Sequence, residues 1–586
     1  MDLSNLLRDL KEVEINANPH ATLSKLTDFN KKNSDKFECQ KSSAEVRSEL
    51  IGILFKLAKE YDNKLNDQAA EHSVALALKE VLICIKVLSR VKEIAFTMGN
   101  GGKFVDELAE RANIENGRDR DAIKGSDGEK EVQRLNILKE AELEAAKIIC
   151  NCVFHCQEFR RHFSKSRHSK LVTKRLGELV TRLDKEKELC SMLIKVLFLM
   201  SALDINEREK MRTEYKTDEM LITFLAAVLK TFEGSIEEGS SGSTQKMLDQ
   251  KVDASVTLVI EVLKALFNVT VNVADASLIE EQACKNYCTL SCLLQEYLVH
   301  PHFASVLPSA LVGHIANMFI NIPKGCLQGL LPSVKRRPWQ EQVPKFKDYP
   351  CEYELKDVSA VIVLITCLDE ELKQKAPVKD DESHTFSILS CLCHICRCLR
   401  LTRKYLRFQI LPPLKDATAR PEMDESLKGR LIKLMTNPNT NVKNMAADFL
   451  FVLCKEDPDR LVKHTGYGNA VGLLAGRGLM GRKSANRTGD YSSDDDDSET
   501  EEYSAIAKDI DPITGAISSK SKEPDPFQGM SEEEKEASAQ ELMTLLDKMS
   551  SLDMIKPMRI GENGRPEVFN VEEAKQLVKE QLNKDK

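Results

Sequence analysis

The chain has 586 residues, with 84 Lys and Arg against 92 Asp and Glu, so its formal net charge is −8. This balance argues against a protein that binds nucleic acid or an anionic membrane through its overall charge. Charged residues make up 30 % and aromatic residues only 5 % of the chain, which favours many thin helical layers over compact aromatic-rich domains.

The start of the chain and its apolar runs bear on localisation. No apolar run reaches the roughly 18 residues that a membrane span needs, and the first residues, from Met1 to Asn5, lack the basic start and apolar region of a signal peptide. The 17 cysteines are scattered through apolar segments, as expected for reduced thiols. We therefore expect a cytoplasmic protein without a membrane span. We also expect a monomer that carries no cofactor.

Several segments share one template, a helix rich in Leu, Ile, Val and Ala that ends in a small or polar residue and turns back. They are Ala145–Phe154, Leu193–Leu203, Val259–Thr270, Val312–Pro323, Val358–Leu368 and Ser387–Leu401. The template resembles armadillo and HEAT repeats, in which helix pairs stack because none can cover its own apolar face, and the inner helices line a concave groove. We predict an all-α, armadillo/HEAT-like solenoid over residues 1–480, with mobile polar insertions near 98–133 and 233–245.

Three asparagines fall near the ends of these apolar helices: Asn151, Asn268 and Asn321. In an armadillo-like groove, such a side chain pairs with the backbone of a bound peptide through its donor and acceptor together. Capping of a helix end, or a solvated amide, is the alternative for each one. We assign them to a candidate groove.

Two cysteine-rich runs invite a zinc interpretation. One contains Cys391, Cys393, His394, Cys396 and Cys398, and the other contains Cys150, Cys152, His155 and Cys156. Zinc needs ligands that converge tetrahedrally, whereas side chains two residues apart on a helix point about 200° apart. We therefore interpret both runs as small buried thiols and expect no metal site.

The run Gly476–Ser484, with sequence GRGLMGRKS, is close to a phosphate-binding loop. Arg482 displaces the lysine, and no strand precedes the loop to aim its amides at a phosphate. The sequence also lacks a nucleophile-elbow motif. We expect neither nucleotide binding nor an enzyme.

A ladder of cations suggests a second binding surface. Arg397, Arg400, Arg403, Lys404 and Arg407 are spaced to share one helix face over about two turns, and Lys335, Arg336 and Arg337 add to the charge. A solvated face is one interpretation. The other is a dock for an acidic or phosphorylated peptide.

The chain supplies such a peptide itself. Residues 481–525 form an acidic linker in which Ser492, Ser493 and Ser498 have acidic residues three positions later, the pattern favoured by acidophilic kinases. A phosphate adds nearly two negative charges and three acceptors that Arg can meet bidentately.

Residues 526–586 form a tail in which we predict two short amphipathic helices. Ser531 and Glu534 make a capping box, followed by an apolar stripe. A second start at Asn570, with Glu573 three residues later, precedes another apolar face. The stripe of the first helix consists of Leu542, Leu545, Leu546 and Met549.

The motifs HTGYGNA (464–470) and GLLAGRGL (472–479), preceded by the apolar helix 442–454, resemble the signature of the synembryn (resistance to inhibitors of cholinesterase) family. LPPL (411–414) and DPITG (511–515) extend the resemblance toward the C-terminus. Members of that family are guanine-nucleotide exchange factors and folding chaperones for heterotrimeric G-protein α subunits (Gα).

The resemblance implies a partner and a mechanism. A member binds GDP-bound or nascent Gα free of βγ, holds its C-terminal helix in the concave groove, and keeps Gα nucleotide-free until GTP binds. The acidic stretch resembles the family's phosphorylated segment, with Ser498 and either Ser492 or Ser493 matching its sites. Gα would also recruit the chain to the cell cortex. The alternative is a helical-repeat adaptor that holds a peptide without nucleotide exchange.

Overall fold

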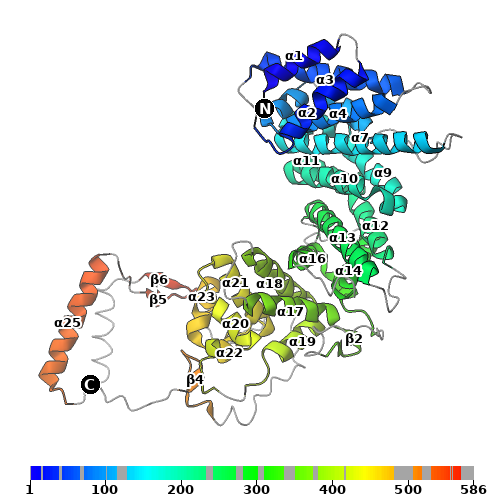
Figure 1. Ribbon diagram of the computed structural model, residues 1–586. Helices are drawn as coiled ribbons and strands as arrows, with labels where there is room; N and C mark the ends of the chain where they lie inside the picture. Colours follow the sequence, from blue (N-terminus) through cyan, green and yellow to red (C-terminus); the bar gives the residue numbers. More distant parts are fainter. Residues whose placement is uncertain are drawn as a thin grey trace. The chain divides into compact units, whose positions relative to one another are not determined.

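The computed structural model describes most of the chain (Figure 1). The described residues are 2–14, 18–38, 42–65, 72–100, 102–114, 128–232, 242–271, 273, 281–300, 309–334, 350–373, 381–414, 417–480, 506–517, 529–552, 554, 556 and 558–568. They divide into two compact units, Met1–Leu330 and Leu331–Lys586.

The first unit is built from helices. They are α1 (Leu3–Glu14), α2 (Pro19–Asn33), α3 (Ala44–Leu65), α4 (His72–Ser89), α5 (Lys92–Gly99), α6 (Lys103–Arg111), α7 (Gly128–His155), α8 (Gln157–Lys165), α9 (His168–Leu179), η2 (Val180–Arg182), α10 (Leu183–Leu203), α11 (Ile205–Thr213), α12 (Thr217–Lys230), α13 (Gly242–Val269), α14 (Glu281–Val299), α16 (Ser309–Asn321) and η3 (Lys324–Leu330).

These helices stack in two rows. In one row α2 packs on α4, α4 on α7, α7 on α10, α10 on α13 and α13 on α16; in the other α8 packs on α9, α9 on α12 and α12 on α14. The long row helices bury apolar side chains at spacings of three and four, as Leu193, Val196, Leu197 and Met200 do in α10. Stacking therefore covers faces that no single pair could cover.

The second unit has a helical body and a tail. Its elements are β1 (Glu352–Tyr353), β2 (Lys356–Asp357), α17 (Ser359–Lys373), α18 (Asp381–Cys398), α19 (Arg400–Ile410), η6 (Pro421–Met423), α20 (Leu427–Leu434), α21 (Thr440–Leu453), α22 (Pro458–Thr465), α23 (Tyr467–Arg477), β3 (Ile510–Asp511), β4 (Ala516–Ile517), α25 (Glu532–Ser551), β5 (Met558–Ile560) and β6 (Pro566–Val568). In the body, α21 packs against α18, α19, α20 and α23. The six strands pair as three antiparallel two-stranded ribbons, β1–β2, β3–β4 and β5–β6.

The predicted all-α fold of stacked helical repeats is confirmed. The predicted capping box is also present at the start of α25, where the Glu534 amide donates to Ser531 Oγ over 3.3 Å and the Ser531 amide donates to Glu534 Oε2 over 2.9 Å. The second predicted tail helix, from Asn570, lies outside the described residues. No helix in the described part of the chain is long and apolar enough to span a membrane.

Two sequence predictions about local structure are wrong. The run 387–401 is not one helix, because Leu399 is extended (φ −115°, ψ 106°) and separates α18 from α19. The polar insertion expected at 98–133 contains α6, which buries Val105, Leu108 and Ala109. Their apolar contacts hold the helix in place although glycines and charges flank it in the sequence.

Within the predicted acidic linker 481–525, residues 510–517 form the ribbon β3–β4.

Candidate partner-binding surfaces

The three candidate asparagines all donate hydrogen bonds to a neighbouring helix of the row. Asn151 on α7 donates from Nδ2 to Ser89 Oγ on α4 over 2.8 Å. Asn268 on α13 donates to Ser201 Oγ on α10 over 3.3 Å. These bonds form a repeated clasp between successive row helices.

Asn321 is the most buried of the three, at 9 % exposed. Its Nδ2 donates to the Phe267 carbonyl over 3.0 Å and to Thr270 Oγ1 over 3.2 Å. The structure thus gives each asparagine a role in stacking. Binding of a peptide by these side chains remains a prediction.

Exposed apolar side chains lie at the ends of two row helices, and the sequence analysis missed them. Phe154 on α7 is 58 % exposed and Leu203 on α10 is 43 % exposed. Phe154 follows Asn151 by three residues, so the two share a helix face. The sequence alone does not mark Phe154 as exposed, because its position fits the apolar template and the template assigns it to the core.

The five-residue cation ladder does not lie on one helix, because Leu399 interrupts it. Arg397 is on α18, where its Nε lies 3.2 Å from Glu456 Oε1. The other members are on α19. Lys404 pairs with Glu354 over 2.6 Å and lies over the Tyr353 ring. Arg403 is only 5 % exposed, so the prediction of one exposed positive stripe is wrong.

Arg403 instead belongs to a repeated structure that we name the arginine corner. At each corner a residue with extended backbone ends one helix and starts the next, and an arginine four residues later donates back to a carbonyl of the first helix. This arginine satisfies a carbonyl that the helix end would leave without a partner. The three bonds are Arg160 Nη1 to Val153 O (2.6 Å), Arg208 Nε to Ser201 O (2.7 Å) and Arg403 Nη1 to Cys396 O (2.9 Å).

The first half of the glycine-rich motif, TGYG, contacts the ribbon β3–β4. The Tyr467 amide donates to the Pro512 carbonyl over 2.8 Å, and the Gly468 amide donates to the Ile513 carbonyl over 2.9 Å. Both donors lie in the first turn of α23, where helix amides lack an intrahelical partner. Gly466 has φ +76°, and a Cβ on it would lie 2.9 Å from the Thr514 carbonyl carbon. Glycine is therefore required for the backbone angle and for the close approach.

A second tail ribbon meets the other end of α23. The Met480 amide donates to the Gly564 carbonyl, in the turn of β5–β6, over 3.1 Å. Gly478 is left-handed at φ +69°, and a Cβ there would lie 2.6 Å from the Asn563 carbonyl oxygen. The motifs TGYG and RGL therefore each hold one ribbon of the C-terminal tail.

His464, at the end of α22, lies among cations. Burial of the His464 side chain is the main cause that lowers its pKa to about 3, and the positive charges around the ring lower it further. The ring is therefore neutral at physiological pH. The contributing cations are Lys428, Arg407, Lys463 and Arg460.

The cysteine runs on α7 and α18 do not bring three ligand atoms together among the described residues. Cys391, Cys393 and Cys396 are buried along α18, and burial raises the pKa of Cys393 to about 11. A different set does converge: Cys284 and Cys288 from α14 with Cys326 from η3. The sequence analysis missed this set, although Cys284, Cys288 and Cys292 repeat at intervals of four.

Several predicted site residues lie outside the described residues. They are Ser492, Ser493 and Ser498 in the acidic segment, and Lys335, Arg336 and Arg337.

Comparison with known proteins identifies the class to which these stacked helices and the glycine motif belong. The family model of the guanine nucleotide exchange factor synembryn (Ric8) matches residues 81–565. This chain belongs to the synembryn family.

Relatives match over most of their own length. The chaperone Ric-8A of Xenopus tropicalis is 31 % identical over 560 residues, which cover 96 % of this chain and 95 % of that protein. Ric-8A of Gallus gallus is 34 % identical over 430 residues, which cover 72 % of this chain and 75 % of that protein. The chaperone Ric-8 of Drosophila pseudoobscura pseudoobscura is 30 % identical over 455 residues, covering 75 % of each chain.

Proposed function

We propose that this chain promotes guanine-nucleotide exchange on G-protein α subunits and helps these subunits to fold. The observation that carries the proposal is the match of the exchange-factor family to residues 81–565. Relatives that are named chaperones and align along nearly the whole chain support the second activity.

In the proposed mechanism the chain makes and breaks no covalent bond. It binds nucleotide-free Gα more tightly than GDP-bound Gα, and this difference in affinity is what drives GDP out. By the same linkage, GTP lowers the affinity of Gα for the exchange factor and ends the cycle.

The row of α7, α10, α13 and α16 is the proposed surface for the C-terminal helix of Gα. An amphipathic helix needs apolar pockets or anchors on the receiving surface, and the exposed side chains of Phe154 and Leu203 supply apolar area there. The last carbonyls of a bound helix lack intrahelical donors. A carboxamide has two N–H donors, and Asn268, which donates to Ser201 Oγ, can make a further bond to such a carbonyl. Asn151 and Asn321 each donate to two acceptors within the row, so each would have to exchange one of these bonds to bind the carbonyl.

The tail offers a second contact. Helix α25 exposes its apolar stripe, with Leu542, Leu545 and Leu546 at 58 %, 54 % and 45 % exposed. Apolar stripes of this kind mark surfaces that a partner covers. We propose that α25 closes over Gα once the C-terminal helix of Gα is held.

Phosphorylation of the acidic segment is the proposed regulator. In the sequence, residues 481–505 connect Met480, whose amide donates to Gly564 O, to the paired strands of β3–β4, so the serines are covalently tethered to the second unit at both ends. Phosphates on Ser492, Ser493 and Ser498 would compete with Glu456 for Arg397 and with Glu354 for Lys404. The proposed binding site for the phosphorylated segment therefore consists of the cations on α18 and α19.

Release of labelled GDP from purified Gα tests the exchange activity. We expect the chain to accelerate release, and Phe154→Ala to reduce this acceleration about thirtyfold, the effect of removing a binding hot spot of about 2 kcal/mol. Phe408→Ala is the matched control, since Phe408 is also an exposed phenylalanine, at 63 %, but on α19. Stable binding of Gα without faster GDP release would contradict exchange and support the adaptor function.

Kinase treatment tests the regulation separately. We expect phosphorylation by an acidophilic kinase to increase the exchange rate, and the triple change Ser492→Ala, Ser493→Ala, Ser498→Ala to abolish the increase. An unchanged rate after stoichiometric phosphorylation would show that the acidic segment does not control exchange.

A further inference from the structure

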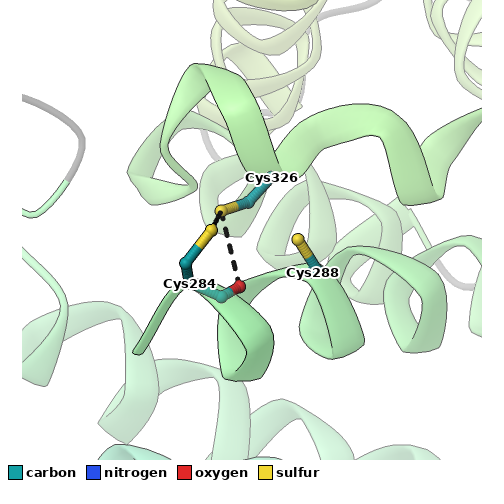
Figure 2. Close-up of side chains that lie close together, drawn as sticks. All are labelled: Cys284, Cys288 and Cys326. Atoms are coloured by element: carbon teal, nitrogen blue, oxygen red, sulfur yellow. Dashed lines mark hydrogen bonds between the residues drawn. The ribbon is translucent and has the colours of Figure 1, made fainter. Parts of the chain in front are cut away.

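Three cysteines from two elements of the first unit direct their sulfurs into one space (Figure 2). Cys284 and Cys288 lie one turn apart on α14, and Cys326 belongs to η3. The three Sγ atoms lie within 4.8 Å of one another, and those of Cys284 and Cys326 are 3.2 Å apart.

The backbone is built to bring these elements close. Gly329 lies one 3₁₀ turn after Cys326 and therefore on the same side of η3. A Cβ on Gly329 would lie 2.7 Å from the Cys292 amide nitrogen and 2.8 Å from its Sγ. Only glycine lets η3 approach α14 this closely, and the approach places Cys326 over the other two thiols.

The spacing of the sulfurs suits a metal ion. At a metal–sulfur distance of about 2.3 Å, two thiolates on a tetrahedral or trigonal ion lie about 3.8–4.0 Å apart. The sulfur separations of this cluster, from 3.2 Å to within 4.8 Å, bracket that value. A shift of a few tenths of an ångström in the side chains would therefore complete the geometry.

The burial of the three residues also suits a metal ion. Cys326 is 1 % exposed, whereas Cys284 and Cys288 are half-buried. The cluster is thus closed on the η3 side and reachable from solvent along α14. A water or another small ligand can take the position that three protein ligands leave open.

We propose that Cys284, Cys288 and Cys326 form a binding site for one thiophilic d¹⁰ metal ion, zinc or copper(I). Thiolates are soft ligands that select these ions over magnesium or calcium. Binding releases the thiol protons to solvent and joins η3 to α14, so the ion stabilises the folded state of this end of the first unit.

Cobalt(II) is the spectroscopic probe, and the full chain is the sample. We expect reduced, chelator-treated protein to bind about one Co²⁺ with a sulfur-to-cobalt charge-transfer band, and zinc to displace it. A competition with a copper(I) chelator under anaerobic conditions determines which of the two ions is preferred. Mass spectrometry of the protein as isolated reports which ion it carries.

The variants Cys284→Ser, Cys288→Ser and Cys326→Ser should each lose most of the cobalt band. Cys292→Ser is the matched control, because Cys292 lies on the same helix, one turn beyond Cys288, and outside the cluster. Circular dichroism of the metal-free variants separates a lost ligand from a lost fold. Zinc should raise the Tm of the wild type and of Cys292→Ser only.

Three outcomes would overturn the site. The first is the absence of a charge-transfer band in folded wild-type protein. The second is equal metal binding in Cys326→Ser and Cys292→Ser. The third is a Cys284–Cys326 disulfide that persists in protein isolated under reducing conditions, since it would remove two of the three ligands.

Discussion

The amide of Gly468 donates to the carbonyl oxygen of Ile513 over 2.9 Å, which joins the glycine-rich motif at the start of α23 to a ribbon of the tail. Gly468, the last residue of TGYG, and Asp511, the first residue of DPITG, are 43 positions apart in the sequence. The contact between the two motifs gives a physical reason for the residues of each motif. The glycines leave room for the ribbon backbone, and the Asp511–Gly515 turn presents carbonyls to amides that α23 cannot satisfy itself.

Substitution of Gly466 should release this ribbon. In Gly466→Ala the methyl group would clash with Thr514 and would also be strained at φ +76°, so we expect a loss of about 1–3 kcal/mol. Limited proteolysis within residues 506–517 should become faster. Gly472→Ala is the control, because a Cβ there meets no atom within 4 Å; helix propensity predicts that it stabilises α23 by up to about 1 kcal/mol. Equal proteolysis of the two variants would contradict the docking.

The interhelical clasp predicts a stability effect for Asn321. Asn321→Ala removes the donor to Phe267 O and Thr270 Oγ1 and leaves Phe267 O with the longer bond from Thr270 Oγ1, at 3.4 Å, which should cost about 1–3 kcal/mol. Asn206→Ala, on the exposed surface of α11, should change stability by less than about 0.5 kcal/mol. Thermal melts followed by circular dichroism measure the difference. A stable Asn321→Ala variant with weakened Gα binding would instead make the groove contact its main role.

The arginine corner makes a prediction for Arg403. Arg403→Ala removes the donor that satisfies the buried Cys396 carbonyl, and we expect a loss of about 1.5–3 kcal/mol, the range for a charge-assisted bond. Arg400→Ala, one turn earlier and exposed, should cost less than about 1 kcal/mol. Urea denaturation of both variants provides the test. Similar losses would show that Arg403 acts through general charge and not through its bond to the helix end.

The sequence predicted those features that short-range spacing determines. Apolar residues three and four apart predicted the row helices, and Ser531 with Glu534 predicted the start of α25. The break at Leu399 was missed because no glycine or proline marks it. Leu399 is 4 % exposed, and its extended backbone depends on burial and on the Arg403 bond, which are tertiary contacts.

The candidate sites were harder to predict for the same reason. Cys284 and Cys288 show helical spacing, but nothing local in the sequence pairs them with Cys326. The tail ribbons each have strands of two or three residues, too short for a period-two pattern. Their position depends on the glycines of α23. The asparagines were correctly placed near helix ends, whereas their hydroxyl partners could be known only from the stacking.

His464 predicts how stability depends on pH. Its folded-state pKa is about 3, below the ordinary value of 6.5, so the unfolded chain binds a proton that the folded chain excludes. The stabilisation is complete above pH 6.5 and declines as the pH falls toward 3. Between pH 6.5 and pH 5 this one group should cost roughly 2 kcal/mol. Calorimetric melts of the wild type and His464→Gln at pH 7 and pH 5 isolate the contribution of His464, since the two proteins have all other titrating groups in common. The variant should lose less stability on acidification, and parallel curves would show that the ring is already accessible to protons in the folded state.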